Sequence, residues 1–123
     1  MTERTLRLLY RDIPTFSCRP GCTDCCGPVP WSPEELARID VPIGAEWVEI
    51  KGVRALTVVD ALRCPFAQGG RCVVYDRRPF MCRLFGSVAG EPRLTCPHGC
   101  HPGKPLTATR AASLADQYRR MVS

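Results

Sequence analysis

In the segment Phe16-Ser-Cys-Arg-Pro-Gly-Cys-Thr-Asp-Cys-Cys-Gly27, four cysteines lie within nine residues: Cys18, Cys22, Cys25 and Cys26. The first three are spaced Cys-x3-Cys-x2-Cys, so a tight loop can bring their sulfurs to one metal centre. Cys26 differs, because neighbouring side chains point to opposite faces of a strand or to different faces of a helix. The segment therefore predicts a metal-binding loop in which Cys26 bridges two metals, serves a second site or stays a free thiol.

Five more cysteines follow, and they bring the total in this chain of 123 residues to nine: Cys64, Cys72, Cys82, Cys96 and Cys100. So many cysteines indicate either a disulfide scaffold for an oxidising compartment or metal ligation in the reducing cytoplasm. Residues 1–12 alternate charged and apolar side chains, so we expect no signal peptide. An odd number of cysteines also cannot pair completely. The sequence favours a metal-binding protein in the cytoplasm.

A last group of candidate ligands lies in the run Cys96-Pro-His-Gly-Cys100-His101. Thiolate and imidazole are the preferred ligands of zinc, and here both occur in one short loop. We take Cys96, Cys100 and His101 as candidate metal ligands and leave the role of His98 open.

The chain carries 17 basic and 12 acidic residues, a formal net charge of +5. No dense block of lysine and arginine is interleaved with aromatic residues, so the sequence does not favour a nucleic-acid partner. No run approaches the roughly 20 apolar residues of a membrane span, so no membrane partner is expected either. Positive side chains near cysteines can stabilise thiolates. We expect four residues to brace the metal site from outside or to bind an anion: Tyr75, Asp76, Arg78 and Arg83.

The pattern of the remaining chain predicts a small α+β fold. Residues 3–13 have apolar side chains at helical spacing, Ser32-Pro-Glu-Glu35 begins a helix that runs to Ile39, and residues 45–50 and 53–59 form a β-hairpin. Pro79 opens a short helix that carries Cys82, and a helix over residues 108–121, capped by Thr107, packs on the hairpin and core. We expect one irregular, metal-stabilised domain over residues 1–123, with its metal-binding region at 16–101.

The order of these motifs resembles a known family, the small cysteine-cluster proteins called YkgJ-like, which are described as zinc- or iron-chelating domains. The resemblance rests on the run from Cys18 to Cys26, the Ser-Pro-Glu-Glu-Leu helix start, Cys64-Pro-Phe, Gly70-Arg-Cys-Val-Val-Tyr75 and Arg78-Pro-x-x-Cys-Arg83. It spans about residues 16–85. The resemblance implies metal binding through seven cysteines: Cys18, Cys22, Cys25, Cys26, Cys64, Cys72 and Cys82.

The spacing leaves the metal open. Zinc would suit paired cysteines, with Cys22/Cys25 and Cys96/Cys100 closing one tetrahedron and the other cysteines forming a second site. A [4Fe-4S] cluster would suit the Cys-x3-Cys-x2-Cys segment, with a fourth ligand from Cys64, Cys72 or Cys82. Both metals accept soft thiolate ligands, and we expect one or two metal centres.

Three function classes follow from a cysteine cluster of this kind. The favoured one is a metal-binding module for zinc or iron. The second is a metal-dependent enzyme, or an accessory subunit, with an open metal position. The third is a zinc-finger-like module that binds a protein or nucleic acid. The three-cysteine spacing also resembles that of radical S-adenosylmethionine enzymes, but this chain is far shorter and has no glycine-rich cofactor segment. We assign no catalytic residue.

Overall fold

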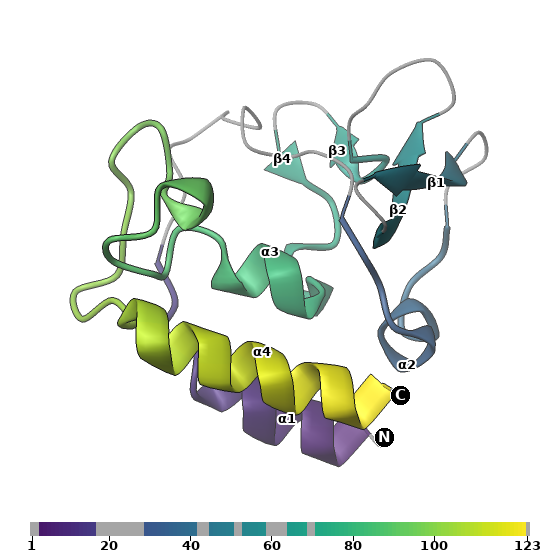
Figure 1. Cartoon of the computed structure of the whole chain (residues 1–123). Helices are drawn as coiled ribbons and strands as arrows, with labels where there is room; N and C mark the ends of the chain where they lie inside the picture. The colour runs from purple at the N-terminus through teal and green to yellow at the C-terminus, as the bar shows by residue number, and fades with distance from the viewer. Residues whose placement is uncertain are drawn as a thin grey trace. The chain divides into compact units, whose positions relative to one another are not determined.

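The computed structural model of the chain describes residues 3–16, 29–41, 45–50, 53–58, 64–68 and 71–122 (Figure 1). The helices there are α1 (Glu3–Arg11), α2 (Pro33–Leu36), α3 (Phe80–Leu84) and α4 (Ala108–Val122), with 3-10 turns at Tyr75–Arg77 and Pro92–Leu94. The strands are β1 (Ala45–Ile50), β2 (Val53–Val58), β3 (Ala67–Gln68) and β4 (Arg71–Cys72). The chain is therefore a small α+β protein, as its sequence predicts.

The chain divides into two compact units, each described here by itself. The helical unit comprises Met1–Arg19 and Phe80–Ser123, and the hairpin unit comprises Pro20–Pro79. Among the described helices, none combines the length and the hydrophobicity of a membrane span.

The core of the helical unit is built by α1, α3 and α4. Helix α1 buries Leu6, Leu9 and Tyr10 on one face, because side chains three and four residues apart share a face of a helix. Leu114 lies at the centre of the buried face of α4 and is fully buried. The two helices run antiparallel side by side (Figure 1), and the start of α4 is tied to the end of α1 by an ion pair from Arg110 to Asp12 at 3.3 Å.

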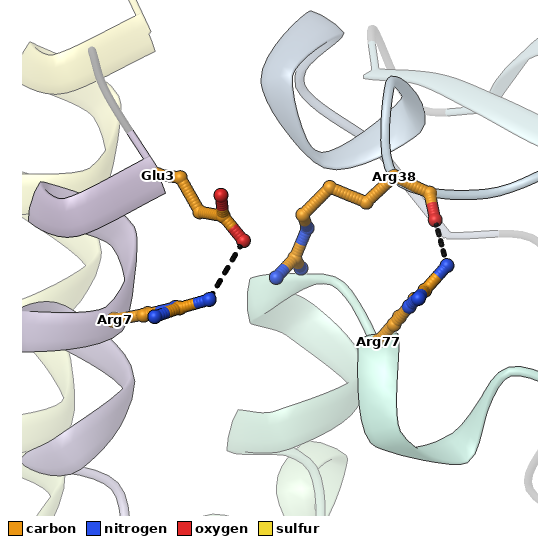
Figure 2. A network of polar contacts seen from close by, with 4 residues as sticks. All are labelled: Glu3, Arg7, Arg38 and Arg77. Atoms are coloured by element: carbon orange, nitrogen blue, oxygen red, sulfur yellow. Dashed lines mark hydrogen bonds and ion pairs between the residues drawn. The ribbon is translucent and has the colours of Figure 1, made fainter.

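The aromatic ring of Tyr118 in α4 stacks on that of Phe80 in α3, with ring centroids 4.5 Å apart. The sequence predicted that this helix packs on the hairpin and core. Its burial in a core is confirmed, and its packing on the hairpin stays a prediction. The buried residues of α4 belong to a cluster with α1 and α3, whereas the buried residues of the hairpin belong to a different cluster. On the exposed side of α1, Arg7 pairs with Glu3 one helical turn earlier at 3.1 Å (Figure 2).

The hairpin unit contains the predicted β-hairpin, in which β1 pairs antiparallel with β2 from Ala45↔Val58 to Ile50↔Val53. Its core is a second buried cluster around Trp31, Leu56 and Phe66. The backbone N–H of Leu56 donates to the carbonyl of Val29 at 3.1 Å, so the segment before α2 is fixed against β2. Because Trp31 follows Val29 by two residues, this hydrogen bond also helps to position Trp31 in the cluster.

Helix α2 begins as the sequence predicts but is shorter. The Ser32 side chain accepts the N–H of Glu35, and the Glu35 carboxylate accepts the N–H of Ser32 at 3.1 Å, which completes a capping box. The helix ends at Leu36, and turns continue the chain toward Ile39. Four residues give few internal hydrogen bonds, so the capping box and the buried Glu35 hold this turn in place.

Candidate metal centre

In the hairpin unit, Cys64 precedes β3 and Cys72 ends β4, so both lie toward the open end of the short antiparallel β3–β4 ribbon. Cys72 is the last residue of β4 and pairs with Ala67 of β3. The N–H of Val73 then donates to the carbonyl of Phe66 at 3.0 Å, which holds the strands together beyond the pair. Cys64 is only 7% exposed, whereas Cys72 is partly exposed. The ribbon thus brings together two thiols that are eight residues apart in the sequence.

The sulfur of Cys64 is held by the backbone that follows it. Pro65 comes next, and the N–H of Ala67 donates to the Cys64 carbonyl at 3.2 Å, which closes a β-turn. Burial raises the pKa of the Cys64 thiol, and the nearby Cys72 acts in the same direction. The backbone N–H groups of Phe66 and Ala67 point at the sulfur and act to lower that pKa. The described backbone offers hydrogen bonds to a thiolate, but the effect of burial is larger.

In the helical unit, a loop carries Cys96 and Cys100 and is fixed at both ends to the segment after α3. Before the loop, the N–H of Gly86 donates to the carbonyl of Leu94 at 2.7 Å. After it, Leu106 exchanges backbone hydrogen bonds with Ser87 at 2.7 Å and Ala89 at 2.8 Å. The two thiols are therefore presented by a loop with anchored ends.

Cys96 has the same kind of turn as Cys64. Pro97 follows it, and the N–H of Gly99 donates to the Cys96 carbonyl at 3.1 Å. Burial acts to raise the pKa of the Cys96 thiol, but hydrogen bonds from His98, Cys100 and Gly99 outweigh it and lower that pKa. The thiol of Cys100 also hydrogen-bonds to Cys96, so the two side chains are adjacent. Gly99 has φ +77°, a left-handed conformation that lets successive N–H groups converge on one anion.

The two Cys-Pro turns are a feature that the sequence interpretation missed. Each places a cysteine sulfur against the N–H groups two and three residues later, and each has a second cysteine close to the first. The signal in the sequence was the repeated dipeptide Cys-Pro at Cys64 and Cys96, because proline favours the second position of such a turn.

Cys82 is presented by α3, as the sequence predicts, and is partly buried there. Its neighbour Arg83 places its guanidinium over the ring of Tyr10 in α1, 4.0 Å from the ring centroid. Arg83 therefore packs α3 on α1 through a cation–π contact. Its predicted role beside the metal site stays a prediction.

The other residues predicted to support the site lie in or beside the 3-10 turn Tyr75–Arg77. The guanidinium of Arg78 lies over the ring of Tyr75, 3.9 Å from the centroid, and Arg78 Nε donates to the Tyr75 carbonyl at 2.9 Å. Asp76 is exposed in the same turn. Figure 2 shows Arg77 donating to the carbonyl of Arg38 at 2.6 Å, which ties the turn to the end of α2. Whether Tyr75, Asp76 and Arg78 support a metal or bind an anion stays a prediction.

His101 directly follows the second thiol of the Cys96 loop and is exposed. Its Nδ1 lies 2.8 Å from the carbonyl oxygen of Pro102, so this nitrogen carries the proton and donates. Nε2 is then the nitrogen with a lone pair, which is the arrangement typical of a metal-ligating histidine. The geometry is compatible with His101 as a ligand.

The four cysteines of the first segment, Cys18, Cys22, Cys25 and Cys26, lie outside the described residues. The five described cysteines form no disulfide bond with one another: Cys64, Cys72, Cys82, Cys96 and Cys100. Within the described ranges, no group of three or more cysteine, histidine or carboxylate side chains lies close enough to hold a metal ion. The described residues therefore provide pairs of ligands, and a site with four ligands needs further cysteines.

The nine cysteines of this small α+β fold include two pairs of neighbouring thiols, Cys64 with Cys72 and Cys96 with Cys100, and thiolates are a donor set that suits zinc or iron. The chain belongs to the family CxxCxxCC, described as "Putative zinc- or iron-chelating domain", whose model matches residues 17–101. The match confirms the predicted family and extends it past residue 85 to include Cys96, Cys100 and His101. In this chain the first cysteine interval has three residues, one more than the family name shows. Comparisons with curated proteins and with solved structures found no match.

Proposed function

We propose that the chain binds zinc or iron through one or two centres, to which Cys64 and Cys72 contribute one pair of thiolates and Cys96 and Cys100 another. The observation that carries the proposal is the environment of Cys64. Its sulfur is buried next to a second thiol, and two backbone N–H groups point at it. Such donors stabilise a thiolate, which is the form that binds a metal.

A metal ion supplies what the Cys64 site lacks. In its absence, burial and the neighbouring Cys72 favour the protonated thiol and raise the pKa of Cys64. A cation between the two sulfurs would remove that penalty, because a coordinating thiol is deprotonated outright. Zinc and iron both accept soft thiolate ligands, so the donor set fits either metal. An iron–sulfur cluster also fits, because its irons are held by cysteine thiolates.

Each described pair provides two ligands, whereas a structural zinc site or a [4Fe-4S] cluster takes about four. We propose that the remaining ligands come from Cys18, Cys22, Cys25, Cys26 and Cys82. His101 is a further candidate through Nε2, because its Nδ1 is engaged by Pro102. Arg78 and Arg83, with Tyr75 and Asp76, would support the centre from outside or bind an anion.

The metal is proposed to stabilise the fold. A chain of 123 residues has a modest core, and its buried apolar residues form two small clusters. Binding energy at ligands from distant segments then adds to the free energy of unfolding. The proposal keeps residues 1–123 as one cysteine-cluster domain and places it in the cytoplasm, where thiols stay reduced. It assigns no catalytic role.

The test is metal content, measured on protein purified without oxygen. A brown protein with a broad absorption band near about 400 nm and several irons per chain would identify a cluster, and a colourless protein with zinc would identify tetrahedral thiolate sites. Cys64→Ser, Cys72→Ser and the double variant should lose the same metal, with no further loss in the double variant, because both residues serve one centre. Full metal content in the double variant would refute the role of this pair.

A further inference from the structure

The indole N–H of Trp31 is a buried donor. The residue is 8% exposed, and within the described ranges no acceptor lies within hydrogen-bonding distance of Nε1. Buried N–H groups in folded proteins are nearly always paired, and an unpaired one reduces stability. The indole nitrogen of tryptophan is a hydrogen-bond donor only, so its partner has to be a hydrogen-bond acceptor. The position of Trp31 therefore points to a partner that is not among the described protein groups.

The surroundings of Trp31 identify the kind of partner. Its ring packs against that of Phe66, with centroids 5.2 Å apart and planes tilted by 55°. The backbone N–H of Phe66 points at the sulfur of Cys64, and all three residues belong to one buried cluster with Leu56. A bound water would need two to four polar partners, and this cluster of apolar side chains supplies few. Cys64 is the candidate metal ligand of this cluster, so the acceptor that a metal centre would bring to it is a sulfur.

We propose that, once a metal centre forms at Cys64 and Cys72, the indole N–H of Trp31 donates to a sulfur of that centre, either a thiolate or a bridging sulfide. Without the metal, neither thiol of the pair accepts this N–H. This inference rests on the proposed function and adds a positioning residue to it. A metal-bound thiolate keeps negative charge and accepts hydrogen bonds well, so Trp31 joins the N–H groups of Phe66 and Ala67 around that charge.

The chain offers a matched control, because it has two tryptophans. Trp31→Phe removes the N–H and keeps an aromatic ring against Phe66. Trp47→Phe makes the same change on the hairpin, where Trp47 is partly buried beneath Arg54 and 4.9 Å from its guanidinium. Co²⁺ is the probe, titrated into the metal-free full-length chain, because its bonds to thiolates give an absorption band in the near ultraviolet.

We expect Trp31→Phe to weaken Co²⁺ binding about 10-fold and to move the thiolate band to longer wavelength. Loss of a hydrogen bond raises the energy of the sulfur lone pairs. The charge-transfer transition from sulfur to metal then needs less energy, so its band moves to longer wavelength. Trp47→Phe should change neither quantity. An unchanged band and affinity in Trp31→Phe would overturn the inference and leave metal binding intact, whereas absence of any thiolate band in the wild-type protein would overturn the proposed function itself.

A second measurement does not depend on the folding of Trp31→Phe. In Trp47→Phe the only tryptophan is Trp31, and Co²⁺ should quench most of its fluorescence because the metal lies next to the ring. Cys64→Ser introduced into the same variant should abolish the quenching. Trp31 fluorescence that does not respond to Co²⁺, in a protein that shows the thiolate band, would contradict the inference.

Discussion

Gly99→Ala tests whether the Cys96 loop binds metal in the conformation seen here. Gly99 has φ +77°, and a Cβ built on it meets no atom within 4 Å. The substitution therefore creates no clash and changes only the backbone preference. An alanine would favour a right-handed conformation, in which the N–H groups after Cys96 no longer converge on its sulfur.

The size of the effect follows from the backbone. A left-handed conformation costs a residue with a Cβ about 1–2 kcal/mol. In the metal-free protein the loop is exposed and can relax to avoid this strain, but metal binding has to restore the conformation. The strain then reduces the binding free energy, which corresponds to an affinity about 5- to 30-fold weaker.

Gly90→Ala is the matched control for this experiment. Gly90 has φ +76° and equally open space around its Cβ position, but it lies outside the Cys96 loop. Both glycines are exposed and their loops can relax, so both variants should lose less than about 1 kcal/mol of stability in the metal-free protein. Only Gly99→Ala should weaken zinc binding in a titration against a competing chelator. Equal affinities in the two variants would refute the assignment of Cys96 and Cys100 as ligands.

Three other predictions concern the cores and the thiols. Leu114→Ala should lower the free energy of unfolding in urea by about 2–5 kcal/mol because it leaves a cavity in the helical unit, whereas Leu8→Ala, at a residue 49% exposed, should cost less than about 0.5 kcal/mol. Ser32→Ala should lower the free energy of unfolding by about 1–2 kcal/mol in the same assay, because it removes the cap of α2 and a 2.9 Å hydrogen bond to the buried Glu35. An unchanged midpoint of the urea transition would show that the cap does not contribute to stability. In the metal-free protein at neutral pH, iodoacetamide should modify Cys96 before Cys64, because the pKa of the first thiol is lowered and that of the second is raised. Peptide mass spectrometry that found the reverse order would contradict the hydrogen bonding described around Cys96.

The elements that were predicted correctly are those fixed by local chemistry. The capping box at Ser32 needs only residues within one turn, and the hairpin over residues 45–58 follows from two apolar strands joined by a short turn. The C-terminal helix was placed correctly for the same reason, since Thr107 accepts the N–H of Arg110 at 3.1 Å. These signals lie within a few residues of the structure they determine.

What could not be predicted depends on contacts between distant segments. The sequence shows that one face of α4 is apolar, but it does not identify α1 and α3 as the elements that share its buried cluster. Gly86 is another case. Its φ is +81°, and a Cβ there would lie 2.4 Å from the ring of Phe16, which is 70 residues earlier in the chain. Sequence spacing paired Cys96 with Cys100, which lie in one short loop, but it did not single out Cys64 and Cys72 as a pair, because it carries no information on which strands and turns bring two sulfurs together.

The two thiol pairs have opposite electrostatic environments, and this affects how metal binding depends on pH. Cys96 has a lowered pKa, so metal binding there releases fewer protons than it would at a thiol with the ordinary pKa. Cys64 has a raised pKa, so metal binding there displaces a bound proton and strengthens as the pH rises toward that pKa. In the metal-free protein the raised pKa of Cys64 contributes stability below its ordinary value of 9.0, and that contribution is lost as the pH rises through the folded-state pKa. If the two pairs serve different centres, the Cys96 pair should therefore load first at mildly acidic pH, and the Cys64 pair should follow as its thiol is deprotonated.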